Sequence, residues 1–276
     1  MKKIVFPLAF LVFLGAACSQ QQVTNSPGAS KQPVNTSPTA VNEASTNTNG
    51  STTSVIWENT GGGWVALGTP PDCPDPFVMQ PPVNLAQVTS VLYPGQSRPD
   101  YKPHGGFRFD NAADNAMVVT VPLEGKIIRG SRYLVAGETQ YTFDIVHPCG
   151  MMMRFGHLLE LTPKFQAIIN TFPPSQEGDS RTTRVEPPLP VALGEVIATK
   201  VGLTKPEKNV FFDFGLFDLR AKNVVSQSPS YAASHSPELD QHAVCWLDYL
   251  NPADKVAVRG LPPGDPKAGK TSDYCK

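Results

Sequence analysis

A strong excess of charge of either sign is missing from this chain. Its 276 residues carry 23 Lys and Arg against 24 Asp and Glu, a formal net charge of -1. Domains that bind nucleic acid usually concentrate Lys and Arg on one face, and no basic run occurs here. The composition therefore predicts no nucleic-acid partner. Beyond the first residues there is also no apolar run long enough to cross a membrane as a helix.

Several short catalytic and cofactor motifs are absent as well. The chain contains no G-x-G-x-x-G, no G-x-S-x-G and no C-x-x-C. Dinucleotide-binding folds, α/β-hydrolase nucleophiles and many zinc-binding modules each rest on one of these patterns. The sequence gives no support to any of these three classes of protein.

The first eighteen residues have the order of parts of a secretory signal. Lys2 and Lys3 precede an apolar run over 4–14, and small residues lead into Cys18. A Cys placed there resembles bacterial lipoprotein signals, which implies a lipid on Cys18 and attachment to a membrane, facing the periplasm or the cell exterior. Ser19 favours the outer membrane if the cell is Gram-negative. The alternative is an ordinary cleaved signal with Cys18 as a buried thiol.

The next segment, 19–54, consists almost wholly of Ser, Thr, Asn, Gln, Pro and Ala. Such a composition cannot bury enough apolar surface to offset the entropy of ordering it, so we expect a linker. The rest of the chain suits one domain, which we divide into an N-terminal extension (55–98), a central β domain (99–220) and a C-terminal extension (221–276).

Cysteine usage agrees with export. Without Cys18 an even number remains, and an oxidising compartment favours two disulfides over four free thiols. Three pairings are possible. We favour Cys245 with Cys275, which would fasten the C-terminal segment, and Cys73 with Cys149, which would tie the N-terminal extension to the central domain.

The folded part reads as mainly β and rich in loops. Prolines divide it into short elements, and only 163–171 has the apolar spacing of a helix. The strand-like runs are 116–121, 125–129, 142–147, 151–155, 196–201 and 210–217.

Five segments between His104 and Leu219 carry the most information. They are K-P-H-G-G-F-R-F-D (102–110), V-P-L-E-G-K-I-I (121–128), F-D-I-V-H-P-C-G-M-M-M-R-F-G-H-L (143–158), L-G-E-V-I-A-T-K-V-G (193–202) and N-V-F-F-D-F-G-L (209–216). In this order and spacing they resemble the lysostaphin-type (LytM-like) zinc endopeptidases, which cut peptide cross-bridges in bacterial peptidoglycan. The resemblance covers a little under half of the chain. It implies a small antiparallel lysostaphin-type barrel or sandwich with one helix-containing insertion and loop-rich extensions at both ends.

That family holds a zinc ion with a His and an Asp of H-x-G-x-D and the second His of H-x-H, while two further histidines assist. The open fourth position lets the metal acidify a water molecule. Carried over without gaps, the resemblance retains His104 as a ligand and His157 as an assisting histidine. It places Arg108 at the ligand Asp, Asp213 at the ligand His and Phe211 at the other assisting histidine.

These departures lead to the main prediction about the site. Arg108 has no lone pair for zinc, and its charge repels a divalent cation. The two replacements carry opposite charges, so we expect Arg108 and Asp213 to form an ion pair in the volume where zinc would lie, with no metal and no other cofactor. The alternative is a shift by two residues, which makes His104, Asp110 and Asp213 an altered metal triad for zinc.

The resemblance leaves three functions open. The leading one is a non-catalytic envelope protein, a pseudo-metallopeptidase, that binds peptidoglycan or regulates a cell-wall enzyme. The second is a working metallopeptidase with substituted ligands, and the third is a structural surface lipoprotein. Trp57, Trp64 and Trp246 could form a platform for glycan, although buried aromatic anchors are the commoner use of such residues.

Overall fold

The computed structural model describes residues 55–276. The predicted signal peptide, the predicted lipidation at Cys18 and the predicted linker over 19–54 therefore lie outside the described residues. No helix among residues 55–276 has both the length and the apolar character needed to cross a membrane.

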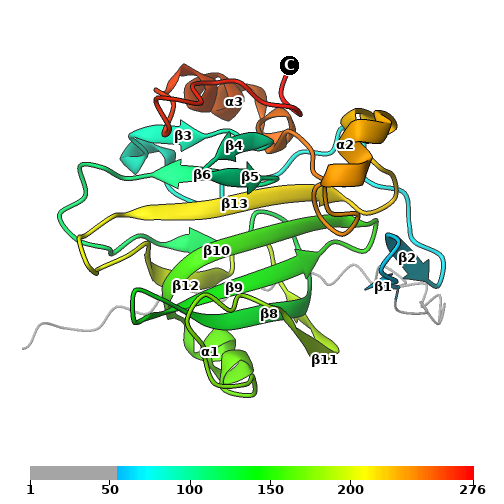
Figure 1. Ribbon diagram of the computed structural model, residues 1–276. Coiled ribbons are helices and arrows are strands. Elements are labelled where there is room, and N and C mark those ends of the chain that lie inside the picture. Colours follow the sequence, from blue (N-terminus) through cyan, green and yellow to red (C-terminus); the bar gives the residue numbers. More distant parts are fainter. Residues whose placement is uncertain (1–54) are drawn as a thin grey trace, which may run out of the picture. The chain divides into compact units, whose positions relative to one another are not determined.

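The core of the fold is a nine-stranded antiparallel sheet (Figure 1). Its strands follow the order β11-β8-β9-β10-β13-β6-β3, and β12 pairs with β10 and with β7. The bounds are β3 (Ser90–Leu92), β6 (Gly105–Arg108), β7 (Val119–Thr120), β8 (Gly125–Val135), β9 (Glu138–Val146), β10 (Met151–Leu161), β11 (Thr183–Val191), β12 (Val196–Val201) and β13 (Phe211–Asp218).

Alternation of side chains along the strands gives the sheet one strongly apolar face. On β10 and β13, Met153 and Phe155 lie on the same face as Phe212 and Phe214, because the two strands pair Met153 with Leu216 and Phe155 with Phe214. All four side chains are fully or almost fully buried. Burying an aromatic side chain of this size typically contributes about 1.5–3 kcal/mol. This face forms the main core.

The helical elements are short, and one of them packs on the apolar face of the sheet. The predicted helix is confirmed as α1 (Pro163–Ile169), which contacts β8 and β10 and starts at a proline whose missing N–H costs nothing in the first helical turn. The other helical elements are η1 (Leu85–Gln87), η2 (Val224–Gln227), α2 (Pro229–Ser234), η3 (Trp246–Tyr249) and α3 (Pro252–Gly260).

Both predicted extensions contribute to the folded unit. The N-terminal one forms the hairpin of β1 (Ile56–Asn59) and β2 (Trp64–Leu67) and supplies β3 to the main sheet. A further hairpin joins β4 (Gln96–Arg98) to β5 (Asp100–Lys102). The C-terminal extension places Trp246 in the main core, where its ring packs against Phe107 and Phe214.

The favoured disulfide pairing is confirmed. Cys73 bonds to Cys149 and Cys245 bonds to Cys275. The first bridge links the N-terminal extension to the turn between β9 and β10, and the second fastens the end of the chain beside η3. Because they close loops of 76 and 30 residues, each removes many conformations from the unfolded chain.

The expected fold class is confirmed at the level of a mainly β protein with antiparallel pairing. A closed barrel is not formed by the described residues, because the ordered path of the main sheet begins at β11 and ends at β3 without a pairing between them. The register explains the open form: β13 pairs with β10 only over Met151–Gly156, and β12 takes over the pairing from Leu158 onward.

Candidate functional site

A small cavity lies on the polar face of the sheet, opposite the main core. It has a volume of about 190 Å³ and reaches across β8, β9, β10 and β13. Its walls are formed by Lys102, His104, Tyr133, Thr142, Arg154, Gly156, His157, Ser180 and Asp213. Three residues singled out from the sequence, His104, His157 and Asp213, are thus brought together.

Cross-strand pairing explains why the cavity is open at this point. Arg154 lies opposite Gly215 and Gly156 lies opposite Asp213, so the four residues form a square with charged side chains at two diagonal corners. Gly156 contributes no side chain, and a Cβ there would approach the Cβ of Asp213 to 3.3 Å. At Gly215 a Cβ would come within 3.0 Å of the His104 Cβ. The two glycines therefore make room for the cavity and for His104.

Asp213 is the centre of the site. Its Oδ2 lies 3.1 Å from Nε2 of His104 and 3.5 Å from Nε2 of His157. Its side chain is 19% exposed. Burial alone would raise the pKa of Asp213, but the neighbouring His104 and His157 outweigh burial and hold the pKa well below the ordinary value. The carboxylate is therefore ionised at neutral pH.

His157 occupies an unusual backbone position. Its φ is +57°, at an irregularity in the pairing of β10 with β9, and its ring packs 4.4 Å from the ring of Phe211. Nδ1 lies 3.3 Å from Oε1 of Gln140, whose amide nitrogen donates to the carbonyl of Gly202. Burial lowers the pKa of His157, against the opposing attraction of Asp213. The ring is therefore mostly neutral at pH 7, and it can carry its proton on Nδ1, facing Gln140, or on Nε2, facing Asp213.

Further cationic groups surround Asp213. The buried guanidinium of Arg98 donates to the carbonyl of His104 and attracts Asp213. Lys102 lies on the rim of the cavity and pairs with Asp100. Tyr133 closes another side, and burial raises its pKa to about 12, so the phenol stays protonated.

A row of alternating charges crosses the polar face and fixes Arg154. Asp144 is fully buried, and its Oδ2 accepts from Nε of Arg129 at 2.6 Å and from Nη1 of Arg154 at 3.1 Å. Arg129 also pairs with Glu238 and stacks over the ring of Trp64. These contacts leave Nε and Nη2 of Arg154 without a protein acceptor among the described residues, and Arg154 lines the cavity.

The expected ion pair between Arg108 and Asp213 is corrected by the structure. Arg108 instead donates to Oδ1 of Asp110 from Nε at 3.1 Å and from Nη2 at 2.9 Å, and it also donates to Asn209. The register places Arg108 opposite Phe211 and Asp213 opposite Gly106, on one face of the sheet, so the reason lies in the side chains. The nearer carboxylate of Asp110 takes the guanidinium, and Asp213 is left to the histidines.

Asp110, a member of the alternative metal triad, has other partners in the structure. Oδ2 of Asp110 accepts hydrogen bonds from Thr89 at 2.8 Å and from Ser90 at 3.2 Å, apart from His104 and Asp213. Within residues 55–276, no group of three His, Cys, Asp or Glu side chains is arranged to hold a metal ion. The family's ligand carboxylate is replaced by an arginine that faces Asp110, so the donor set does not fit the family's zinc.

The three tryptophans serve as buried anchors. Trp57 donates its indole N–H to the carbonyl of Pro148, and Trp64 donates to the carbonyl of Glu238. Both rings are less than one-tenth exposed, and Trp246 is fully buried. Rings placed in this way do not offer the open face that a glycan platform needs.

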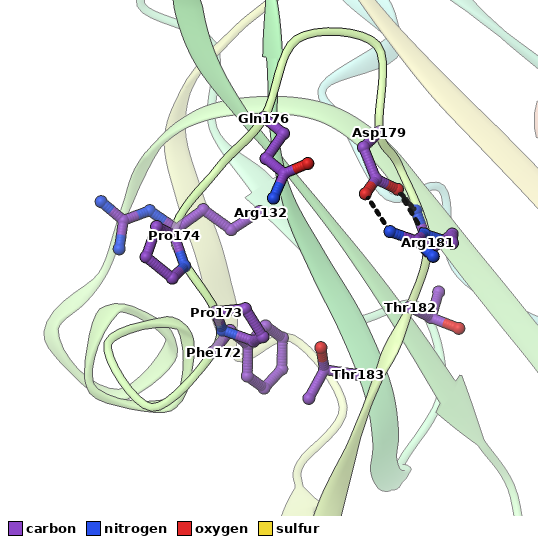
Figure 2. Close-up of a pocket in the computed structure, with 9 residues that line it drawn as sticks. All are labelled: Arg132, Phe172, Pro173, Pro174, Gln176, Asp179, Arg181, Thr182 and Thr183. Carbon is purple, nitrogen blue, oxygen red and sulfur yellow. Dashed lines mark hydrogen bonds and ion pairs between the residues drawn. The ribbon is translucent and has the colours of Figure 1, made fainter.

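A second cavity, of about 310 Å³, lies on the other side of the loop that follows α1 (Figure 2). Asp179 and Arg181 pair with each other on one side of it, with Nη2 and Oδ2 2.6 Å apart, and Pro173 and Pro174 form part of its wall. The charges of Asp179 and Arg181 neutralise each other near the surface, where such pairs contribute little to stability, and Arg132 adds a positive charge to the wall. Ser180, between the paired residues, belongs to the wall of the first cavity.

Whether one sequence motif binds phosphate can be decided only from the structure around it. Residues 264–271 read G-D-P-K-A-G-K-T, which matches the letters of the phosphate-binding P-loop. A P-loop joins a strand to a helix, whereas this segment follows α3 and consists of turns. Oδ1 of Asp265 accepts from the backbone N–H groups of Lys267 and Ala268. The amides that would hold a phosphate are therefore occupied.

Sequence reasoning missed most of the cavity wall. Arg154, Thr142 and Tyr133 carried no motif, although each is a polar or amphipathic residue at an alternate position of an otherwise apolar strand. That period-two pattern was the available signal. It indicates a polar face, but the register between strands is needed to see that these side chains meet.

Comparison with known proteins adds nothing to this geometry: no family model matches the chain, and neither a curated protein nor a solved structure was found to be similar to it.

Proposed function

We propose that this protein is a lipid-anchored cell-envelope protein whose cavity binds peptidoglycan without cutting it. The observation that carries the proposal is the arrangement of Asp213 between His104 and His157 in an open cavity. His104, at the position of a metal ligand, and His157, at the position of an assisting histidine, lie close together. Both imidazoles contact the carboxylate of Asp213 directly. The arrangement suits the binding of a polar ligand.

The polar character of the cavity supports a wall peptide as the ligand. Stem peptides of peptidoglycan offer carboxylates, amines and amide groups, and the cavity presents both charges together with the phenol of Tyr133 and the hydroxyl of Thr142. The signal-like N-terminus and the two disulfides suit a protein that works outside the cytoplasm. The lysostaphin-type motifs, which contribute His104, His157 and Asp213, point to the same ligand.

A pull-down on purified sacculi tests the proposal directly. The full-length chain should sediment with sacculi, and Gly156→Val, which would fill the cavity and press on Asp213, should abolish this. The matched control is Glu160→Gln on the same strand, where the exposed Glu160 pairs only with Lys200 and Thr199. Circular dichroism must show that both variants are folded.

Three outcomes would contradict the proposal in different ways. Release of soluble wall peptides by the purified chain, together with stoichiometric zinc, would show a working metallopeptidase. Equal binding by the chain and by Gly156→Val would place the wall-binding surface elsewhere. If neither the unaltered chain nor Gly156→Val sedimented with sacculi, two functions would remain: binding to a protein partner in the envelope, or the role of a structural surface lipoprotein.

A further inference from the structure

The cavity presents a separated cation and anion, each fixed by partners of its own. Arg154 is held by the buried Asp144, and Asp213 is held by His104 and His157. Residues at diagonal positions of neighbouring strands lie roughly 7–8 Å apart at their Cα atoms. Arg154 and Asp213 make no direct ion pair. An ion pair between them would close the cavity, and their separate partners prevent this.

The cationic side has free hydrogen-bond donors. Only Nη1 of Arg154 is used by Asp144, so Nε and Nη2 remain for a ligand. A guanidinium edge with two parallel N–H groups matches a carboxylate in the paired geometry that arginine favours. This side of the cavity therefore suits a carboxylate.

The anionic side has free acceptors. Oδ1 of Asp213 has no hydrogen bond to another described residue, while Oδ2 faces Nε2 of His157 at 3.5 Å. When the ring proton of His157 lies on Nδ1 and is donated to Oε1 of Gln140, Nε2 carries a lone pair. In that tautomer Oδ2 of Asp213 and Nε2 of His157 are both acceptors, and a donor between them is needed. A positively charged ammonium group supplies several donors and would satisfy both.

We infer that the cavity binds the zwitterionic head of an α-amino acid, with its carboxylate on Arg154 and its ammonium group near Asp213 and His157. This inference rests on the proposed function and names the part of the wall peptide that would be recognised, namely a side-chain end that carries a free α-amino group and a free α-carboxylate. A volume of about 190 Å³ is below the range of roughly 300–1,000 Å³ typical of sites for larger ligands. It fits one such head and not an extended chain.

Three related small molecules test the inference on the full-length chain. D-alanine carries both charges, D-alaninamide lacks the carboxylate, and N-acetyl-D-alanine lacks the ammonium group. Titrations followed by NMR should show D-alanine binding about ten-fold or more tightly than either capped compound, since each cap removes one charge-assisted contact. Equal binding of all three compounds, or binding of none, would overturn the inference.

Two substitutions assign each end of the ligand to its residue. Arg154→Gln should remove the preference for D-alanine over D-alaninamide and keep the preference over N-acetyl-D-alanine. Asp213→Asn should remove the preference for D-alanine over N-acetyl-D-alanine and keep the preference over D-alaninamide. In Arg154→Gln the buried Asp144 keeps its pair with Arg129, so the fold should persist. If either variant does not fold, the comparison of the three compounds on the unaltered chain still decides the matter.

The outcomes for the inference and for the proposed function can be told apart. Binding to sacculi that depends on Gly156, without any preference among the three compounds, would overturn the zwitterion inference alone. Loss of both the sacculus binding and the preference would overturn both. If a chelator abolished the preference for D-alanine over either capped compound, and the purified chain contained zinc, the site would be assigned to a metal. That result would also overturn the inference.

Discussion

Replacing Asp144 by Leu is the most demanding test of the polar face of the sheet. The carboxylate is fully buried, and its Oδ2 accepts from both Arg129 and Arg154. Removing it leaves two guanidinium groups with side chains only 11% and 19% exposed. Breaking a buried pair in this way typically costs about 3–5 kcal/mol, because the remaining charge stays desolvated.

The partners of each arginine place the expected value within that range. In Asp144→Leu, Arg129 still pairs with Glu238 and still lies over the ring of Trp64, so the loss of its pair with Asp144 is partly compensated. Arg154 keeps no acceptor among residues 55–276 but borders the open cavity, so water can reach it. We therefore expect Asp144→Leu to lower the free energy of unfolding by about 3 kcal/mol, at the lower end of the range.

Urea denaturation followed by circular dichroism measures this loss, with the disulfides kept intact. The matched control is Glu160→Gln, which breaks the exposed pair with Lys200 and should change the free energy by less than about 1 kcal/mol. The double variant Arg129→Met with Asp144→Leu should recover part of the loss, which a double-mutant cycle isolates. A loss for Asp144→Leu no larger than for the control would refute the reasoning.

Three further predictions concern other parts of the chain. Cys18→Ser should release the protein from the membrane fraction, and unchanged partition on fractionation would contradict the lipid anchor. Replacing Cys245 and Cys275 by Ser should cost about 3–4 kcal/mol for a closed loop of 30 residues, and denaturation showing no loss would contradict that contribution. Because burial lowers the pKa of His157, the folded state binds fewer protons than the unfolded state below about pH 6.5. Stability should therefore fall as the pH is lowered from 7 to 5, and His157→Gln should make this slope smaller; an unchanged slope would show that His157 is not its source.

The elements of the fold were largely accessible from the sequence. Strand-like runs over 196–201 and 210–217 correspond closely to β12 and β13, and the apolar spacing over 163–171 gave α1. These features follow from local patterns of apolar residues, which one segment reveals by itself. The disulfide pairing was accessible for another reason, because an even number of cysteines in an exported chain leaves few choices.

The pairing of side chains on the polar face was not accessible in the same way. The prediction for Arg108 and Asp213 placed both on one face, which the register confirms, since Arg108 lies opposite Phe211. It did not account for Asp110, which follows Arg108 by two residues and turns its carboxylate back to the guanidinium. Which of two nearby carboxylates an arginine selects depends on side-chain geometry, and sequence spacing does not contain it.

Gly156 shows how a small feature of the sequence acquires meaning only in the sheet. In the strand M-M-M-R-F-G-H it reads as a weak point, because glycine weakens the interior of a strand. The register places it opposite Asp213, where any side chain would press on that carboxylate. Arg154, one position earlier on the same face, is turned to the cavity by the buried Asp144 on β9. The cavity therefore depends on Gly156, which has no side chain to fill it, and on Arg154, which pairs with Asp144 and not with Asp213.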